Sequence, residues 1–144
     1  MHKVWTIGYE QTTVDAFLSA LTTAGVKVVA DVRAIAASRR PGFSKTALAA
    51  NLASVGIEYR HFRALGTPAD GRAAARAGNQ VALERIYAGQ LELPEAILAG
   101  AQLAELVHER PTALLCYERD AAGCHRTVLR KAVLADCAAV DLLP

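Results

Sequence analysis

The sequence has little cysteine: three in 144 residues, at positions 116, 124 and 137. So few cysteines, odd in number, exclude a disulfide-stabilised extracellular scaffold and are typical of a reducing cytoplasm. There is also no uninterrupted apolar run of about 18 residues, which excludes a membrane-spanning helix. The start of the chain is too soon interrupted by polar residues for a signal peptide. We therefore expect a cytoplasmic protein with no membrane association.

Charge of one sign is also scarce, because the formal net charge is only +2. It is unevenly spread: residues 1–76 carry ten Lys/Arg against five Asp/Glu, and residues 77–144 carry six against nine. Four basic residues follow one another with no acid between them: Arg33, Arg39, Arg40 and Lys45. Such a basic patch indicates either an anionic partner, a nucleotide or nucleic acid, or simply a solvated loop.

Hydrophobic residues make up 53% of the chain, which is enough for a core and argues against disorder. The length predicts one domain over residues 1–144. Strand-like and helix-like patterns alternate, which predicts βαβ units, a mostly parallel sheet and helices on both faces. We expect this Rossmann-like, three-layer α/β fold to have strands at 3–8, 26–32, 57–62, 112–117 and 138–143.

Capping residues and apolar spacing predict the helices between these strands. We expect helices that begin at Thr12, Ser44, Asn79 and Pro94, and a last one that begins at Gly123 or Asp120. The helix after Pro94 should direct Ile97, Leu98, Ala101 and Ala104 inward. Residues 66–78 give no readable pattern.

Polar residues gather at the ends of the predicted strands. They are Tyr9 and Glu10, Asp31 and Arg33, Tyr59 and His61, and Cys116 and Glu118. Because the carboxyl ends of parallel strands meet at one edge of a sheet, where open sheets bind ligands, we expect a polar site at that edge.

Asp31 and Arg33 are two residues apart on a strand, so their side chains point to the same side. Charges at the end of a buried strand are costly unless they are used or paired. The pair therefore indicates either a carboxylate and a guanidinium that hold a ligand, or a salt bridge that fastens a loop.

Residues 38–45 join three cations, Arg39, Arg40 and Lys45, to a turn and to Phe43. They could bind phosphates, with Phe43 stacked on a base and Ser44 at a helix start offering backbone N–H groups. The alternative is a solvated loop with Phe43 tucked into the core.

The richest segment is residues 116–126. Cys124 falls near a predicted helix start beside His125 and Arg126, which favours its thiolate, and Glu118 could act as a general base or orient His125. The alternative for Cys116 and Cys124 is packing, and for Glu118 and Arg126 it is an ion pair. Two further alternatives fit less well: the phosphatase-like spacing of Cys124 and Arg130, because an apolar helical stretch lies between, and a zinc site of Cys116, Cys124 and His125, because no clear fourth ligand is present.

Several motifs together resemble one family. In order they are Thr6-Ile7-Gly8, Asp31-Val32-Arg33, Ser38-Arg39-Arg40 with Phe43 and Lys45, Tyr59-x-His61 with Leu65-Gly66, and Cys116-x-Glu118 with Cys124-His125-Arg126. The chain is similar to the bacterial domain-of-unknown-function family numbered 488. The resemblance implies a compact α/β fold with a shared site but carries no settled activity.

The chain departs from that family pattern at two positions. Tyr9 stands where the family usually has His after Thr-Ile-Gly, and Thr67 follows Leu65-Gly66 where a second Gly is common. If the family's His is catalytic, the resemblance implies that this chain has an altered activity or none.

We expect Glu118, Cys124 and His125 to be the catalytic group, if the protein is an enzyme. The ligand-binding residues would be Tyr9, Asp31, Arg33, Arg39, Arg40, Lys45, Cys116 and Arg126, with no metal ligand among them. The site would bind, and as an enzyme process, a phosphate-bearing ligand such as a nucleotide or nucleic acid. The alternatives are a non-catalytic anion or nucleic-acid binding module, and a small thiol or metal protein that uses Cys116 and Cys124.

Overall fold

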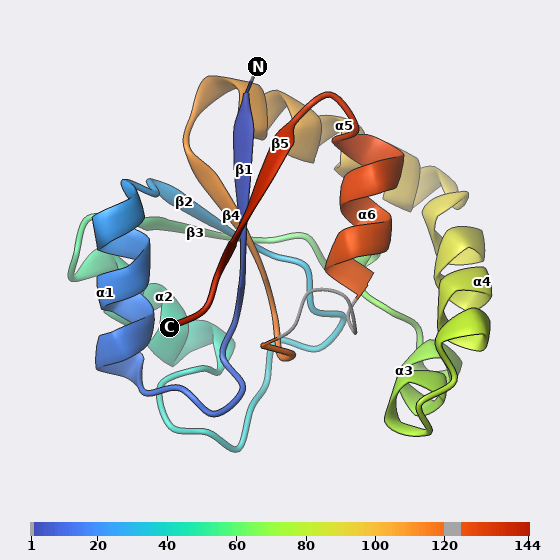
Figure 1. Cartoon of the computed structure of the whole chain (residues 1–144), viewed down its shortest axis with the longest axis horizontal. Coiled ribbons are helices and arrows are strands. Elements are labelled where there is room, and N and C mark those ends of the chain that lie inside the picture. Colours follow the sequence, from blue (N-terminus) through green and yellow to red (C-terminus); the bar gives the residue numbers. More distant parts are fainter. Residues whose placement is uncertain (1, 120–124) are drawn as a thin grey trace.

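The structure, a computed structural model, describes residues 2–119 and 125–144. Its five strands form one parallel sheet with the order β3-β2-β4-β1-β5 (Figure 1). They are β1 (Lys3–Gly8), β2 (Val28–Asp31), β3 (Glu58–His61), β4 (Thr112–Cys116) and β5 (Ala138–Leu142). The α/β fold with a parallel sheet, expected from the sequence, is confirmed.

The helices cover both faces of the sheet. They are α1 (Val14–Ala24), α2 (Lys45–Ala53), α3 (Ala69–Arg76), α4 (Gln80–Leu91), α5 (Pro94–Glu109) and α6 (His125–Val133), with a 3₁₀ turn η1 (Arg63–Leu65). One apolar cluster joins the sheet to α1 and α2, and a second joins it to α4, α5 and α6. The two clusters lie on opposite sides of the sheet, which gives the three layers that were predicted (Figure 1). In the part of the chain that the structure describes, no helix is long and apolar enough to cross a bilayer.

Burial follows the position of each strand in the sheet. Every residue of β2 and β4, at the centre, is buried, as expected for strands covered by helices on both faces. The edge strands β3 and β5 alternate between more and less exposed residues instead. Continuous apolar runs in the sequence therefore marked the central strands correctly.

Three helix starts test the capping residues that the sequence predicts. The cap of α1 is Thr13, whose Oγ1 accepts a hydrogen bond from Ala16 N at 3.1 Å, so the prediction of Thr12 was wrong by one residue. Asn79 caps α4 as predicted. Ser44 precedes α2, but its hydroxyl bonds the backbone of Ser38 and not the helix.

The predicted inward face of α5 is wrong for Ile97, Leu98 and Ala101, which are exposed, whereas Ala104 is half-buried against the core as predicted. Ile97 and Leu98 are 60% and 62% exposed. The residues of α5 that are buried are Ala96, Gly100, Leu103, Leu106 and Val107. In a helix so rich in Ala and Leu, two sets of positions share the spacing of one helical face, and the set that contains Leu103, Leu106 and Val107 buries more apolar surface.

The connections leave the neighbouring strands β4 and β1 in opposite directions. The chain passes from β1 through α1 to β2, and from β4 through α6 to β5, on opposite faces of the sheet. Such a reversal between neighbouring strands opens a crevice outside their carboxyl ends, where open α/β sheets bind ligands. We therefore expect a ligand site at the loops after Gly8 and Cys116. The predicted start of α6 at Gly123 or Asp120 lies outside the described residues.

Candidate functional site

A cavity of about 520 Å³ lies at the carboxyl ends of β1, β2 and β4. The strand ends contribute one wall, and helices α3 and α4 contribute residues on another. Its lining residues are Tyr9, Glu10, Arg33, Ala34, Ile35, Thr67, Arg72, Ala75, Arg76, Leu83, Cys116, Tyr117, Glu118 and His125. The structure thus brings together five of the residues selected from the sequence as ligand-binding or catalytic: Tyr9, Arg33, Cys116, Glu118 and His125.

Arg33 is held by a buried polar network. Its Nε and Nη2 donate to the two carboxylate oxygens of Asp31, at 2.9 and 2.7 Å, and its Nη1 donates to Tyr9 Oη at 3.2 Å and to the carbonyl of Phe43 at 2.8 Å. Arg33 is 6% exposed and Asp31 is fully buried. Asp31 therefore lies behind Arg33 and does not line the cavity.

The same carboxylate also accepts a hydrogen bond from Tyr59 Oη at 2.6 Å. Burial raises the pKa of Tyr59, and the neighbouring negative charge of Asp31 raises it further. For Arg33, burial alone would lower the pKa, but the bonds to Asp31 outweigh burial and raise it. Arg33 thus stays charged, with that charge balanced inside the protein. The ion pair that fastens a loop is present in this geometry, and ligand binding by Arg33, which lines the cavity, stays a prediction.

Phe43 belongs to the core and is 1% exposed, as in the second interpretation of its loop. Its ring stacks on Tyr9 at 4.7 Å between centroids, and Arg40 lies over it at 6.0 Å. Arg40 also donates to the carbonyl of Thr12. Arg39 and Lys45 are exposed. The structure does not bring Arg39, Arg40 or Lys45 to the cavity.

Two glycines let loops approach closely at this edge of the sheet. A Cβ on Gly8 would lie 1.7 Å from the carbonyl oxygen of Glu118, and one on Gly66 would lie 2.2 Å from Cα of Ala34. Only glycine fits at either position without a shift of backbone. The Thr-Ile-Gly and Leu-Gly motifs therefore serve packing around the cavity.

Two carboxylates line the cavity side by side in the loops after β1 and β4. Glu10 N donates to the carbonyl of Tyr117 at 2.8 Å, and Glu10 Oε1 accepts from Arg119 N at 3.1 Å, which ties the two loops together. Burial raises the pKa of Glu118 above its ordinary value of 4.5, and the charge of Glu10 adds to the rise while Arg126 opposes it. Glu118 Oε2 also lies 3.3 Å from the Sγ of Cys116. Glu118 can therefore hold a proton at higher pH than an ordinary glutamate does.

His125 opens the described part of α6 and is 8% exposed. Its Nε2 lies 2.7 Å from the carbonyl oxygen of Val32, and a carbonyl can only accept, so Nε2 carries the proton. Burial lowers the pKa of His125 to about 4, and the positive charge of Arg126 contributes. The imidazole is therefore neutral at pH 7, and Nδ1 is its basic nitrogen.

Arg126 is fully buried and does not line the cavity. Its Nη2 donates to the carbonyl of Glu118 at 2.5 Å and reaches that of Arg119 at 3.5 Å. It therefore shapes the loop that carries Glu118, from behind. Cys116 is 1% exposed in the cavity wall. Cys124 lies outside the described residues.

Sequence reasoning missed Arg72 and Arg76, which α3 directs into the cavity. They are four residues apart and so share a helix face, which is the signal that could have revealed them. Arg72 Nη1 donates to the carbonyl of Thr67 at 3.0 Å. Among residues 2–119 and 125–144, neither arginine forms an ion pair.

The fold and the cavity together define an α/β protein with a parallel sheet and a polar cavity at the reversal between the neighbouring strands β4 and β1. The chain belongs to the family described as domain of unknown function DUF488, whose model matches residues 13–133. No curated protein and no solved structure matches the chain.

Proposed function

We propose that this cavity binds a small phosphate-bearing ligand of nucleotide size, with the phosphate on Arg72 and Arg76. The observation that carries the proposal is the distribution of charge around the cavity. Two arginines on α3 face the same space as Glu10 and Glu118, and none of these four forms an ion pair within the described residues. Charged side chains that line a cavity without pairing are available to a ligand.

The arginines favour phosphate as the anion. Guanidinium groups bind phosphate oxygens through paired, charge-assisted hydrogen bonds. Arg33 contributes little to this potential, because Asp31 balances its charge. The ligand's phosphate would therefore lie against α3 and away from the carboxylates.

The size and the remaining lining favour a nucleotide over inorganic phosphate. A volume of about 520 Å³ falls within the range of small-molecule sites. Ile35 and Leu83 supply apolar surface, and Tyr117, which is 46% exposed, offers a ring face on which a base can stack. Hydroxyl or amino groups of the ligand would then lie near Glu10 and Glu118.

Glu118 is the candidate for proton transfer. Its raised pKa brings it nearer to neutral pH, the range in which general acid–base groups work best. Neutral His125 lines the same cavity and would help to orient the ligand. If Glu118 transfers a proton to or from the ligand, the protein is an enzyme. If no such transfer takes place, the cavity is a binding module for the same ligand.

The proposal is tested by calorimetric titration of the purified protein with AMP, GMP, CMP and UMP, and with adenosine and inorganic phosphate for comparison. We expect at least one monophosphate to bind, and adenosine to bind more weakly than AMP. Replacement of both cavity arginines (Arg72→Gln with Arg76→Gln) should weaken binding about tenfold or more, because charge-assisted hydrogen bonds are lost. Arg85→Gln on α4 is the matched control, because this exposed arginine does not line the cavity.

Two results would count against the proposal: no binding by any monophosphate, or equal binding by the double variant and the wild type. A salt-sensitive affinity for single-stranded oligonucleotides that is lost with Arg39→Ala and Arg40→Ala would favour the nucleic-acid binding module instead. Incubation with the nucleotide that binds best, followed by chromatography of products, distinguishes enzyme from binding module. An enzyme should lose turnover with Glu118→Gln but keep binding.

A further inference from the structure

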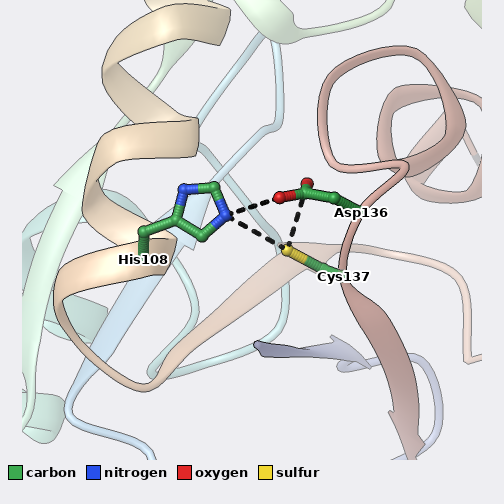
Figure 2. A group of neighbouring side chains, drawn as sticks. All are labelled: His108, Asp136 and Cys137. Atoms are coloured by element: carbon green, nitrogen blue, oxygen red, sulfur yellow. Dashed lines mark hydrogen bonds and ion pairs between the residues drawn. The ribbon is translucent and has the colours of Figure 1, made fainter. Parts of the chain in front are cut away.

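A second group of reactive side chains lies at the amino edge of the sheet, opposite the cavity. His108 is in the last turn of α5, and Asp136 and Cys137 come directly before β5. Figure 2 shows the three side chains converging, with Nε2 of His108 directed at both of the others. Nε2 lies 2.9 Å from Asp136 Oδ2 and 3.9 Å from Cys137 Sγ, and Sγ lies 3.7 Å from Asp136 Oδ1.

These separations are close to those that a tetrahedral metal ion imposes on its ligands. Zinc bonds of about 2.3 Å to sulfur and about 2.0–2.1 Å to nitrogen or oxygen place sulfur about 3.6 Å from the other donors, and nitrogen about 3.4 Å from oxygen. The sulfur distances of 3.9 and 3.7 Å already agree within a few tenths of an ångström. Two adjustments are needed: His108 and Asp136, now hydrogen-bonded at 2.9 Å, would move apart, and the carboxylate, which uses Oδ2 for His108 and Oδ1 for Cys137, would turn to present one oxygen to the ion.

We propose that His108, Asp136 and Cys137 bind a zinc ion that joins the end of α5 to the start of β5. Imidazole, carboxylate and thiolate are the donor types that zinc takes in proteins. The three donor atoms lie within 4.8 Å of one another. The thiolate also argues against Mg²⁺ and Ca²⁺, which prefer oxygen ligands alone.

The exposure of the group suits an ion that enters from solvent. His108 and Asp136 are 37% and 65% exposed, whereas Cys137 beneath them is 5% exposed. Metal would thus reach the carboxylate and imidazole first and then the sulfur. Formation of the zinc–sulfur bond breaks the S–H bond of Cys137 and releases its proton to solvent.

The surroundings support a structural role. The imidazole of His2 lies with its centroid 4.6 Å from that of His108, so the fourth position would be filled by His2 or by water. The amide of Ala138 donates to the carbonyl of His2 at 2.8 Å. An ion here would link α5, β5 and the residue before β1. It would therefore stabilise the folded chain, because the unfolded chain offers no preformed site.

Without a metal, His108 and Asp136 keep an exposed hydrogen bond above a packed cysteine, and such surface contacts contribute little to stability. The two possibilities predict different effects of added metal on the absorption spectrum and the unfolding temperature of the protein.

The experiment uses the tag-free full chain, stripped of metal with a chelator that is then removed. Co²⁺ is added as a spectroscopic probe, Zn²⁺ is titrated by calorimetry, and thermal unfolding is followed with and without Zn²⁺.

We expect one equivalent of Co²⁺ to give a thiolate-to-cobalt charge-transfer band in the near ultraviolet, and Zn²⁺ to displace it and raise the unfolding temperature. His108→Asn and Asp136→Asn, both at exposed positions, should keep the fold and bind Zn²⁺ more than about 100-fold more weakly, since even the loss of a residue that only supports a ligand costs 10–100-fold. Cys137→Ser should abolish the band. Glu109→Gln, at an exposed position next to His108, is the matched control and should bind as the wild type does.

Three results would overturn the proposal. The first is the absence of the charge-transfer band in the folded wild type. The second is retention of the band in Cys137→Ser, which would mean that Cys137 is not the thiolate ligand. The third is displacement of Co²⁺ by equimolar Mg²⁺ or Ca²⁺, which would indicate a site of oxygen ligands alone.

Discussion

The two walls of the cavity are built in different ways. On the strand side, Arg33 donates four hydrogen bonds from its side chain, two of them to a carboxylate that is fully buried. On the α3 side, Arg72 has one hydrogen bond, to a carbonyl, and Arg76 is exposed. Both walls carry guanidinium groups, but only the strand wall balances their charge internally.

The difference separates the charged residues that stabilise the site from those that are available to bind a ligand. A charge inside a buried network stabilises the fold through partners that are already present, and its loss leaves another charge uncompensated. An unpaired charge at a cavity surface adds little to stability and keeps its capacity for a ligand. We therefore expect mutations of the strand wall to change stability first, and mutations of α3 to change binding first.

The largest effect should come from Asp31→Asn. The variant leaves the guanidinium of Arg33 buried beside a neutral amide, and removal of one partner from a buried ion pair costs about 3–5 kcal/mol. Urea denaturation at pH 7 measures the free energy of unfolding, with exposed Asp15→Asn as the control. A loss below about 1 kcal/mol, comparable to the control, would mean that Arg33 is not anchored by this network.

The next effect should come from Gly8→Ala. The new Cβ would meet the carbonyl oxygen of Glu118, at 1.7 Å in the present structure, so one of the two loops must shift, at about 1–3 kcal/mol or more. Gly89→Ala in α4 is the matched substitution, because nothing lies within 4 Å of the added carbon. It should stabilise the helix by about 0.5–1 kcal/mol. Thermal unfolding of both variants checks the contrast, which fails if their shifts have the same sign.

Glu118→Gln should alter the dependence of stability on pH. Because burial raises the pKa of Glu118 in the folded protein, its protonated form favours folding, and that contribution is lost as the pH rises from about 4.5 through the raised value. The wild type should therefore become less stable relative to the variant over this window. Denaturation at pH 4 and pH 8 measures the difference. If the wild type gains stability relative to the variant instead, the carboxylate is stabilised in its charged form.

The smallest effect on stability should come from Arg72→Gln with Arg76→Gln. Since neither side chain forms an ion pair in the described part of the chain, we expect a change within about 0.5 kcal/mol. Urea denaturation of the double variant is the check. A loss above about 2 kcal/mol would give α3 the same structural role as the strand wall and would remove the contrast between them.

The sequence predicted the strand wall better than the helix wall for a physical reason. A run of apolar residues that ends in charged residues is a strong sequence pattern, and Asp31 and Arg33 stand at the end of such a run. In contrast, α3 has Arg72 and Arg76 separated by three alanines, and its one buried residue is Gly71. Because α3 has no large apolar residues at helical spacing, its sequence predicted neither the helix nor the direction in which the arginines point.

Other details depended on packing that a single sequence does not specify. Phe43 could stack on a ligand or enter the core, and its contacts with the rings of Tyr9 and Phe17 place it in the core. Arg126 next to His125 suggested a ligand-binding residue, but its guanidinium is used by the carbonyl of Glu118. The group of His108, Asp136 and Cys137 comes from two elements far apart in the chain, so no spacing motif could reveal it.

The order of the strands also has a consequence for how the chain folds as it is synthesised. In the described sheet β1 lies between β4 and β5, so Trp5 pairs with Ala113 and Val140. Strand β1 is synthesised before β4 and β5, so it has no partner strand until the last quarter of this sequence has been made. Pairings between such distant residues form slowly, because a long loop must close first. During that interval the apolar edges of β1 and β2 stay open, which makes the nascent chain a candidate for chaperone binding or aggregation.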